Sequence, residues 1–462
     1  MVRTLVSQTP EKVGEEVLLK GWVSRRRDHG KLVFVDLRDR TGIVQVVGEN
    51  LLGDLRGEDV IQIVGLVKAR PEAMVNKKIP TGEVEIEAKE IKTISKANPM
   101  PFPIDTDGLE IDEDIRLRFR YLDLRRERAQ HNLRMRHQVI KHIRDYLDKK
   151  DFVEIETPIL TKATPEGARD FLVPSRLQPG SFYALPQSPQ QYKQLLMVAG
   201  FEKYYQIARC FRDEDPRADR AYGEFTQLDL EMSFPTQNEI LSLIEDLYKS
   251  IVKELFPHKK PTFQDFPRLN YSEVMEKYGT DKPDLRENKN DPDELAFLFI
   301  VNFPLFEWKK NENRWDAMHH PFTAPREEDI PDLMEGKNIG KLISCQHDFV
   351  LNGIEIGGGS IRITDPDIQR KIFEILGHTK EEIENKFGHL LEAFTYGVPP
   401  HGGIAPGIDR FLKIILNQPS LREVIAFPMS SSGQTAVMDA PSSADPNQLE
   451  ELGIKVIEKK RK

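Results

Sequence analysis

The residues with the clearest chemical potential lie in two candidate strands and the charged loop between them, from residue 204 to 234. The loop, RDEDPRADR at 212–220, carries too many charges to be buried. In the second strand, a period of two residues places a ring, an amide and two carboxylates on one face, namely Phe225, Gln227, Asp229 and Glu231. Taken alone, this pattern favours a half-exposed antiparallel sheet with one solvated side.

A second candidate is NGIEIGGGSIR at 352–362, where three consecutive glycines interrupt an apolar, strand-like run. Glycines weaken a strand unless another group must approach the backbone closely. Glu355 and Arg362 are seven residues apart, which places them on opposite faces of a regular strand, whereas a glycine-hosted bulge would bring them together. The stretch therefore predicts either a ligand lying on the sheet or a plain glycine turn.

A third candidate is GGIAPGIDR at 402–410, where glycines precede an apolar helical stripe. Backbone N–H groups and the dipole at such a helix start suit anion binding. The stretch matches neither the phosphate loop GxxxxGK[ST] nor GxGxxG after a strand. Arg410 would be a fixed guanidinium that pairs with phosphate or stacks on a ring, although a lone Arg at a helix start is usually solvated.

Two weaker candidates have equally good structural explanations. The adjacent His319 and His320 have poor spacing for joint metal ligation, so polar contacts are the expected role. The stretch TPEGARD at 164–170 is expected to be a loop in which Glu166 and Arg169 could equally be solvated.

Five Val- and Ile-rich stretches near the N-terminus predict the strands of a small barrel: 17–23, 32–36, 43–47, 60–67 and 84–88. Five strands in about 90 residues suit an oligonucleotide-binding (OB) fold, with a generic β-domain as the alternative. Residues 25–27, Phe34 and Gln45 combine cations, a ring and an amide. That set suits single-stranded nucleic acid, while a surface charge cluster is the simpler interpretation.

The rest of the chain predicts a linker followed by a large α+β domain. Three prolines within 98–103 and an acidic patch ending at Asp114 indicate the linker. An apolar stripe predicts a helix over 129–149, and a short strand follows at 152–156. Further strand-like and helical runs alternate, at 204–212, 224–234 and 348–356 and at 237–254, 366–386 and 410–416.

Composition excludes several classes of protein. At about 150 residues per domain, 462 residues suggest roughly three domains. The net charge is −9, but residues 1–100 hold 17 Lys and Arg against 15 Asp and Glu, so only a uniformly basic nucleic-acid coat is excluded. Two cysteines are too few for a disulfide scaffold or a Cys-based zinc site. Without a membrane span or signal peptide, the expected location is the cytoplasm, with neither membrane nor DNA as a partner.

Taken together and in this order, the motifs resemble those of the class II aminoacyl-tRNA synthetases. The segments that carry the resemblance are FRDED…EFTQLDLE, EIGGGSIR and GIDRFLKII, after an N-terminal barrel. Further segments are similar to bacterial-type aspartyl members of that family, namely LPQSPQQYKQLLM, TPEGARDF, AMHHPFT and RYLDLR. The resemblance implies an OB-fold anticodon-binding domain at 1–98, a hinge at 99–128 and a catalytic domain at 129–462 with an antiparallel sheet flanked by helices. The helix at 129–149 and the strand after it would match motif 1, which forms the homodimer interface in the family.

The resemblance implies a two-step ligase reaction. ATP activates L-aspartate to aspartyl-adenylate, and the aspartyl group then passes to the 3′-terminal ribose of tRNA(Asp). No covalent enzyme intermediate is required, so positioning and charge neutralisation should dominate catalysis. The alternatives are an asparaginyl or lysyl relative with the same architecture, or a non-catalytic tRNA-binding paralogue.

The resemblance also implies roles for individual residues in ATP binding. Arg212, Glu214 and Arg410 are implied as catalytic, with Phe225 and Arg410 on either side of the adenine. The complete implied ATP site is Arg212, Asp213, Glu214, Ala221, Phe225, Glu355, Gly407, Ile408, Asp409 and Arg410. Asp348 and Glu355 are implied as ligands of Mg²⁺, which prefers hard oxygen donors.

For aspartate, Lys193 and Arg362 would pair with the side-chain carboxylate, and these two cations would select Asp over Asn by charge. The other implied aspartate-binding residues are Glu166, Ser188, Gln190, Gln227, Asp229, His319 and His320. The anticodon of the tRNA would meet Arg26, His29, Phe34 and Gln45 in the barrel.

Two departures from the family pattern are visible. The bacterial type usually carries an inserted domain after DKPDLR, whereas here a short polar linker at 287–294 stands in its place. The motif 2 loop reads ADRAYGEFTQ where the family usually has ADRQPEFTQ, which changes the local adenine contacts around 221–223. In addition, His29 stands where forms specific for tRNA(Asp) often carry Leu, so we advance the hypothesis that the enzyme also charges tRNA(Asn).

Overall fold

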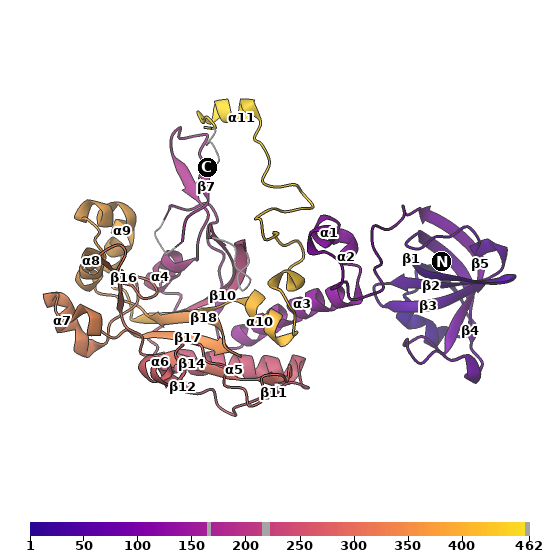
Figure 1. The fold of residues 1–462 in the computed structure, drawn as a ribbon, viewed down its shortest axis with the longest axis horizontal. Coiled ribbons are helices and arrows are strands. Elements are labelled where there is room, and N and C mark those ends of the chain that lie inside the picture. Colours follow the sequence, from indigo (N-terminus) through magenta and orange to yellow (C-terminus); the bar gives the residue numbers. More distant parts are fainter. Residues whose placement is uncertain (164–167, 215–221, 458–462) are drawn as a thin grey trace. The chain divides into compact units, whose positions relative to one another are not determined.

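The computed structural model describes residues 1–163, 168–214 and 222–457. Within it the chain forms two compact units, Met1–Gly108 and Leu109–Lys462 (Figure 1). The chain forms two units rather than three because the second unit is large and is built around one eight-stranded sheet. None of the helices in the described part of the chain is long and apolar enough to cross a bilayer.

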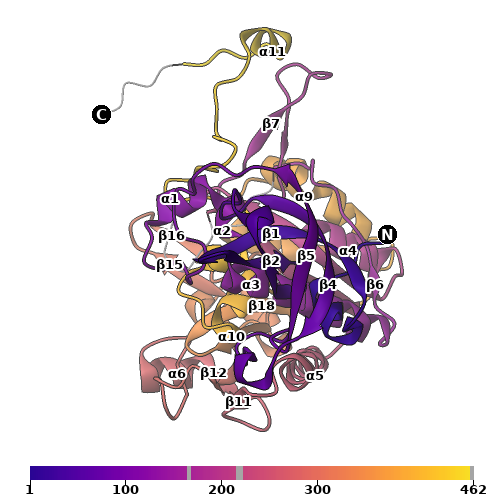
Figure 2. The same ribbon diagram turned by 90° about the vertical axis from the view of Figure 1, so that its right-hand side faces the viewer.

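The first unit is a closed five-stranded barrel in the order β1-β2-β3-β5-β4 (Figure 2). All five predicted strands occur, and each is longer than predicted: β1 (Glu16–His29), β2 (Leu32–Asp39), β3 (Gly42–Gly48), β4 (Val60–Ala69) and β5 (Val84–Ser95). Alternate side chains of these strands are buried and together fill the barrel, as the period of two requires. The prediction of an OB-type barrel is confirmed.

The second unit is built on an eight-stranded sheet in the order β12-β14-β17-β18-β19-β10-β9-β6. From one edge to the other these are β12 (Arg268–Asn270), β14 (Phe297–Val301), β17 (Gln346–Leu351), β18 (Ile354–Ile361), β19 (His401–Pro406), β10 (Gly223–Ser233), β9 (Lys203–Arg212) and β6 (Val153–Glu154). The six central strands pair antiparallel, as predicted, and the two edge strands pair parallel to their neighbours. Three strand pairs lie outside this sheet: β7 (Leu172–Pro174) with β8 (Phe182–Ala184), β11 (Lys260–Pro261) with β13 (Glu294–Leu295), and β15 (Phe306–Lys309) with β16 (Arg314–Ala317).

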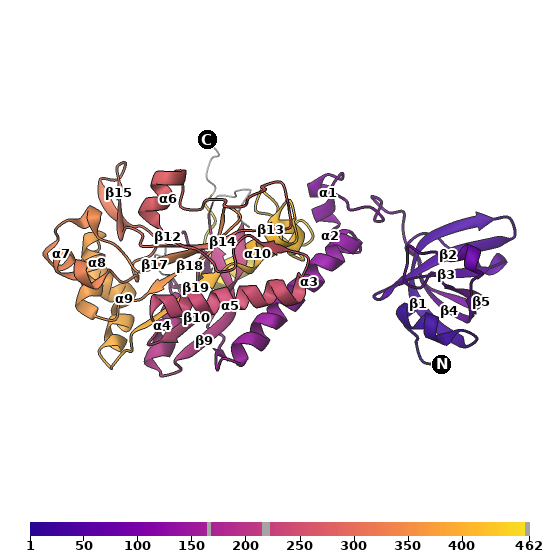
Figure 3. The ribbon, with the colours of Figure 1, turned by 90° about the horizontal axis from the view of Figure 1, so that it is seen from below.

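One face of the large sheet is covered by three helices, α3 (Glu127–Asp148), α5 (Gln237–Leu255) and α10 (Ile408–Ile415), as the view in Figure 3 shows for α3 and α5. Their apolar stripes join the inward side chains of the strands in one core. The predicted helix at 129–149 is therefore confirmed, and its Ile143 and Leu147 are buried in this core. With this face closed, the opposite face of the sheet is the one on which a site can form.

The remaining α-helices of the described residues are α1 (Glu113–Arg118), α2 (Arg120–Asp123), α4 (Gln190–Val198), α6 (Tyr271–Tyr278), α7 (Ile330–Glu335), α8 (Pro366–Ile375), α9 (Lys380–Phe394) and α11 (Pro446–Glu451). Helices α1 and α2 lie in the stretch predicted as a hinge. There Arg120 is buried and donates to the Asp123 carboxylate at 2.6 Å, so this part of the stretch packs as structure within the second unit.

Two predicted elements are wrong because the chain turns inside them. The strand-like run 348–356 spans the end of β17, a tight turn at Asn352 and Gly353, and the start of β18. Both turn residues have positive φ, 51° and 79°, as a two-residue hairpin requires. The helical run 366–386 is two helices, because Gly377 adopts a φ of 91° and Thr379 caps the start of α9.

Candidate active site

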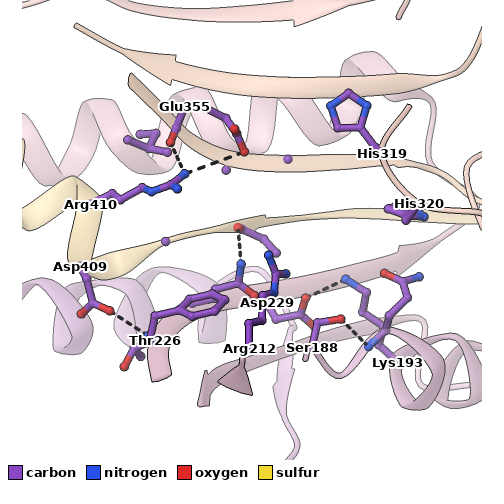
Figure 4. A pocket seen from close by; sticks show the side chains of 18 of the residues that line it. Ser188, Lys193, Arg212, Thr226, Asp229, His319, His320, Glu355, Asp409 and Arg410 are labelled. Carbon is purple, nitrogen blue, oxygen red and sulfur yellow. Dashed lines mark hydrogen bonds and ion pairs between the residues drawn. The ribbon is translucent and has the colours of Figure 1, made fainter. Parts of the chain in front are cut away.

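The site-bearing face of the sheet holds a pocket of about 280 Å³, shown in Figure 4. It draws its walls from β9, β10 and β18, from the starts of α4 and α10, and from the loop after β16. Of the predicted site residues, those that line it are Ser188, Gln190, Lys193, Arg212, Glu214, Phe225, Gln227, Asp229, His319, His320, Glu355, Arg362, Gly407, Asp409 and Arg410. The pocket therefore unites residues from most of the motifs recognised in the sequence.

A few predicted site residues lie elsewhere. Ile408, the first residue of α10, is buried in the core, and Asp348 is buried and does not line the pocket. The Asp213 backbone N–H donates to the carbonyl of Arg169 at 3.0 Å, which places Asp213 against the end of the 164–170 stretch. Glu166 and Ala221 fall outside the described residues.

The polar face of β10 is confirmed, but the solvated sheet that its pattern favoured is wrong. Leu228 and Leu230 point into the core, so Asp229 and Glu231 point the other way. Both carboxylates are completely buried, with an exposed fraction of 0%. A carboxylate is held in such a place only when cations or hydrogen-bond donors meet it.

Two cations meet these carboxylates and form a buried quartet. Lys193 Nζ lies 2.7 Å from Asp229 Oδ1 and 3.2 Å from Glu231 Oε2. Arg362 grips Glu231 with two hydrogen bonds, from Nε at 2.8 Å and from Nη2 at 3.1 Å. The formal charge of the quartet is zero. The sequence-based prediction that Lys193 and Arg362 select aspartate by their charge did not include Glu231, which pairs with both cations.

The two carboxylates of the quartet differ in their surroundings. Burial raises the pKa of Glu231, but Arg362 and Lys193 outweigh it and hold that pKa at about 2. Burial raises the pKa of Asp229 above its ordinary value in spite of Lys193. Asp229 Oδ2 is buried and has no hydrogen-bond partner within the described residues. An acceptor left in this state suits a cationic group of a ligand.

The glycine strand β18 positions Glu355 and Arg362. Its pairing with β17 skips Ile356, so a bulge lies between the two residues, and both line the same pocket. A bulge between Glu355 and Arg362 therefore occurs, but its extra residue is Ile356, next to Gly357, and not a glycine. A Cβ atom on Gly359 would lie 2.1 Å from the carbonyl oxygen of Gly403, so glycine here is required by the close approach of β19.

The opposite end of the pocket carries two arginines and a ring. The guanidinium of Arg212 lies 5.0 Å from the centre of the Phe225 ring, and its Nε is buried without a partner among the described residues. Arg410, in the first turn of α10, donates from Nη1 to the Glu355 carbonyl at 2.7 Å. The neighbouring Asp409 carboxylate is used inside the protein, since it accepts from the Thr226 N–H at 2.9 Å and pairs with Arg136. This end suits an aromatic, anionic ligand such as a nucleotide.

Two acidic side chains stand beside this end of the pocket. Asp348 accepts from Gln346 at 2.8 Å and lies 3.1 Å from His319 Nε2, and these partners lower its pKa although burial opposes them. Burial, followed by the charge of Asp348, raises the pKa of Glu355. A carboxylate whose ionisation is disfavoured by a neighbouring carboxylate gains from a bound cation. In the described part of the chain no group of three or more His, Cys, Asp or Glu side chains is arranged to hold a metal ion.

Sequence reasoning missed several residues that support the site. Gln346 and Ser360 hold Asp348 and Arg362 in place, with Ser360 Oγ accepting from Arg362 Nη1 at 2.8 Å. His320 Nε2 lies 2.8 Å from the same Nη1, so the two adjacent histidines have separate polar partners, as expected. The role of Ser360 could have been predicted, because Ser360 follows the glycines and lies two residues before Arg362, on the same face of a strand. Nothing in the sequence pattern pointed to Gln346.

In the barrel, three of the four predicted anticodon residues share one outer surface. Phe34 and Gln45 project outward from β2 and β3, and the His29 ring meets Phe34 edge-on at 5.5 Å. Arg27, opposite Phe34 on β1, joins them. Arg26 is opposite the buried Val35 instead, and it donates to the carbonyl of Leu52 at 3.2 Å, so it lies on the other face of β1.

Comparison with protein families gives two matches. A model described as tRNA synthetases class II (D, K and N) matches residues 112–431, which is more than half of the chain. A model described as an OB-fold nucleic acid binding domain matches residues 17–94. The two matches correspond to the large unit with its pocket and to the barrel.

Comparison with individual proteins agrees with these family matches. The chain is 41% identical to an aspartate–tRNA(Asp/Asn) ligase of Dehalococcoides mccartyi, with 97% of this chain and 98% of the relative covered. It is 44% identical to the ligase of the same name in Dictyoglomus turgidum, with coverage of 97% and 96%. The first alignment runs over 589 residues, 127 more than this chain has, so the relative contains residues that this chain lacks.

Solved structures share the fold. An aspartyl-tRNA synthetase from Entamoeba histolytica superposes with a TM-score of 0.73 at 23% identity, covering 93% of this chain and 91% of that one. An asparaginyl-tRNA synthetase from Pyrococcus horikoshii, complexed with asparaginyl-adenylate, gives a TM-score of 0.74 at 23% identity, with coverage of 93% and 98%. At this identity the likeness shows the architecture alone.

Proposed function

The chain belongs to the class II tRNA synthetases of the D, K and N group, and from this premise we propose that it is an aspartate–tRNA ligase that uses ATP to attach L-aspartate to tRNA. The observation that carries the proposal is the pocket itself. One end holds two cations and a carboxylate oxygen without a hydrogen-bond partner in the described part of the chain, and the other end holds two arginines and a ring. An amino acid with an acidic side chain and a nucleotide fit these two ends.

At the amino-acid end, the side-chain carboxylate and the α-ammonium of aspartate each have a complementary group. Lys193 and Arg362 would meet the side-chain carboxylate, although both also bind Glu231. The unpartnered Oδ2 of Asp229 would accept from the α-ammonium, together with Ser188, Gln190 and Gln227 around it. Because the quartet is neutral, bound aspartate adds a carboxylate beside two cations, whereas asparagine would leave these donors with a neutral partner. Glu166 belongs to the same proposal.

At the nucleotide end, the adenine would lie between Phe225 and Arg410, with Glu214 near its edge. Arg212 has a buried Nε that finds no acceptor among the described residues, which supports a role in holding the α-phosphate and the carboxylate of aspartate. The proposed ATP site is completed by Asp213, Ala221, Gly407, Ile408 and Asp409. The Asp409 carboxylate is already bound to the Thr226 N–H and to Arg136, so Asp409 would act by holding these groups in place.

Asp348 and Glu355 fit a magnesium ion. The charge of Asp348 helps to raise the pKa of Glu355, so a cation beside Glu355 would be stabilising. The hard oxygen atoms of both side chains suit Mg²⁺, which commonly takes one or two carboxylates together with substrate phosphates. When bound with ATP, the ion would offset the triphosphate charge. His319 would orient Asp348 through the contact at 3.1 Å.

The chemistry needs no nucleophile from the protein. A carboxylate oxygen of aspartate forms a bond to the α-phosphorus while the bond to pyrophosphate breaks. A ribose hydroxyl of the tRNA then bonds to the aspartyl carbonyl carbon while the bond from that carbon to the AMP oxygen breaks. AMP leaves with the electron pair of that bond, and the hydroxyl proton passes to the leaving phosphate. The pocket contributes position and charge, with Arg212 and Arg410 facing the groups that become more anionic.

The tRNA would be read by the barrel. We propose that Phe34 and His29 stack with anticodon bases and that Gln45 reads a base edge, since all three share one outer surface. We propose that Arg26 contacts the phosphate backbone of the tRNA and not a base, because its guanidinium lies on the other face of β1 and is partly exposed. The relatives are named as ligases of both tRNA(Asp) and tRNA(Asn), which supports the hypothesis made from His29 that this enzyme is non-discriminating.

We expect the purified enzyme to aspartylate both tRNA(Asp) and tRNA(Asn). The physical reason is that His29, beside Phe34, offers a polar ring where a Leu would reject one of the two anticodons. Charging of each tRNA transcript with labelled aspartate measures this. The matched variant His29→Leu should keep tRNA(Asp) charging and lose most tRNA(Asn) charging. Aspartylation of tRNA(Asp) alone by the wild-type enzyme would refute the hypothesis.

The proposed assembly is a homodimer. Strand β6 ends the sheet as an open edge, and Val153 on it, with Ile159 and Leu160 after it, is apolar and exposed. An exposed apolar edge of this kind favours a partner chain.

Residues 287–294 remain the proposed position at which this chain lacks the domain of its relatives. The tRNA substrate supports the proposal that the protein is located in the cytoplasm.

A further inference from the structure

Behind the amino-acid end of the pocket, three buried side chains form a hydrogen-bonded chain. Gln190 lines the pocket, whereas Gln194 and His401 do not. Gln190 Nε2 donates to Gln194 Oε1 at 3.0 Å, and Gln194 Nε2 lies 3.1 Å from His401 Nε2. His401 Nδ1 in turn lies 2.8 Å from the carbonyl oxygen of Pro399. Gln194 and His401 have exposed fractions of 0%, so water does not compete for these contacts.

The direction of each hydrogen bond follows from the far end of the chain. The Pro399 oxygen can only accept, so His401 Nδ1 carries a proton. In a neutral imidazole the other nitrogen, Nε2, is then an acceptor, and Gln194 must turn its amide nitrogen toward it. The Gln194 oxygen therefore faces Gln190 and accepts from its Nε2. The Gln190 oxygen is left without a donor within the described residues, on a side chain that lines the pocket.

We propose that His401 and Gln194 are positioning residues for the amino-acid substrate: neutral His401, acting through Gln194, fixes the Gln190 amide so that its oxygen faces the α-ammonium of bound aspartate. The inference rests on the proposed function, because it takes the ligand at this end to be an α-amino acid. Neither His401 nor Gln194 touches the substrate, and their effect passes only through the orientation of Gln190.

A protonated His401 would reverse the chain. Both ring nitrogens would then donate, so Gln194 would have to present its oxygen to His401 and its nitrogen to Gln190. Gln190 would turn its oxygen toward Gln194 and its N–H groups toward the pocket, where they would oppose an ammonium. The charged groups that face His401 are Glu231 on β10, Lys193 on α4 and Arg362 after β18. Burial lowers the pKa of His401 and outweighs the opposing effects of Glu231 and the Pro399 carbonyl, which favours the neutral form.

Two substitutions of His401 separate the acceptor from the ring. In His401→Gln, the amide oxygen reaches the place of Nε2 and can still accept from Gln194. In His401→Asn, the shorter side chain reaches only the place of Nδ1, so Gln194 loses its acceptor and Gln190 its fixed orientation. In ATP–pyrophosphate exchange we expect His401→Asn to raise the KM for aspartate about tenfold, as for one lost hydrogen bond to a charged group, with kcat and the KM for ATP within about twofold. His401→Gln should restore the KM for aspartate to within about threefold of wild type.

Succinate, which is aspartate without the amino group, shows whether the effect concerns the ammonium. Calorimetric titration should show that His401→Asn weakens aspartate binding about tenfold and leaves succinate binding unchanged. Equal weakening of both ligands would overturn the inference, because it would mean general damage to the pocket. On a Gln190→Met background, His401→Asn should add nothing, and a further loss there would also overturn it.

Should His401→Asn fail to fold, Gln194→Met breaks the same chain one link closer to the pocket and is expected to give the same selective loss for aspartate. The outcomes for the function and for this inference remain distinct. Absence of aspartate-dependent exchange in the wild-type enzyme refutes the proposed function. Normal exchange in the wild type, with an unchanged preference for aspartate over succinate in His401→Asn and Gln194→Met, refutes only the inference.

Discussion

Replacing Arg212 by alanine should abolish aspartate-dependent ATP–pyrophosphate exchange, with a loss of about a thousandfold or more, and leave the fold intact. Arg212 lies at the end of β9 beside Phe225, and its buried Nε has no protein acceptor within the described residues. A guanidinium placed in this way is available for the α-phosphate, whose charge changes most in the first step. Initial exchange rates at saturating aspartate and ATP measure the effect.

Arg209→Ala is the matched control for this experiment. Arg209 lies three residues earlier on the same strand, but it is exposed and pairs with Glu224 at 2.7 Å. Its removal should change the exchange rate by less than about threefold, since an exposed ion pair contributes little. Retained exchange in Arg212→Ala, with normal circular dichroism, would show that the assignment of Arg212 is wrong.

The second large effect concerns stability, because Glu231 is the buried partner of two cations. Glu231→Gln leaves Arg362 and Lys193 with a neutral amide, and we expect a loss of about 3 kcal/mol in the free energy of unfolding at neutral pH. Urea unfolding followed by circular dichroism measures the loss. Glu312→Gln is the control, since Glu312 pairs with Arg314 on the surface and its loss should cost less than about 1 kcal/mol.

The pH dependence gives this prediction a sign. The pKa of Glu231 is about 2 in the folded chain against an ordinary value of 4.5, so the unfolded chain binds its proton first as the pH falls. The stabilisation by Glu231 is complete above pH 4.5 and is lost progressively as the pH falls toward 2. The difference between wild type and Glu231→Gln should therefore shrink below pH 4.5. A difference that stays constant as the pH falls would contradict the role of the ionised carboxylate.

Local patterns predicted much of the fold. The barrel strands alternate because one face fills the barrel, and β10 shows its two faces for the same reason. The hairpin at Asn352 and Gly353 was missed although an Asn-Gly pair is a strong turn signal. The break between α8 and α9 was missed although Thr379 and Glu382 form a capping box after Gly377.

The site was less predictable because its electrostatics depend on distant residues. Asp229 looked like a solvated carboxylate, and its partner Lys193 is 36 residues away on α4. Arg362 is 131 residues from Glu231, so the pattern of β10 could not reveal that a buried cation neutralises it. Individual roles came from the resemblance to the family. The quartet and the chain to His401 emerged only when the sheet brought these elements together.

Activation of aspartate by the pocket is tested most directly by amino-acid-dependent ATP–pyrophosphate exchange with Asp, Asn and Lys in parallel. Lys193 and Arg362 gain from a carboxylate and gain little from an amide or an ammonium. We predict exchange with L-aspartate alone. Exchange with asparagine or lysine in place of aspartate, or no exchange with any of the three, would contradict the account.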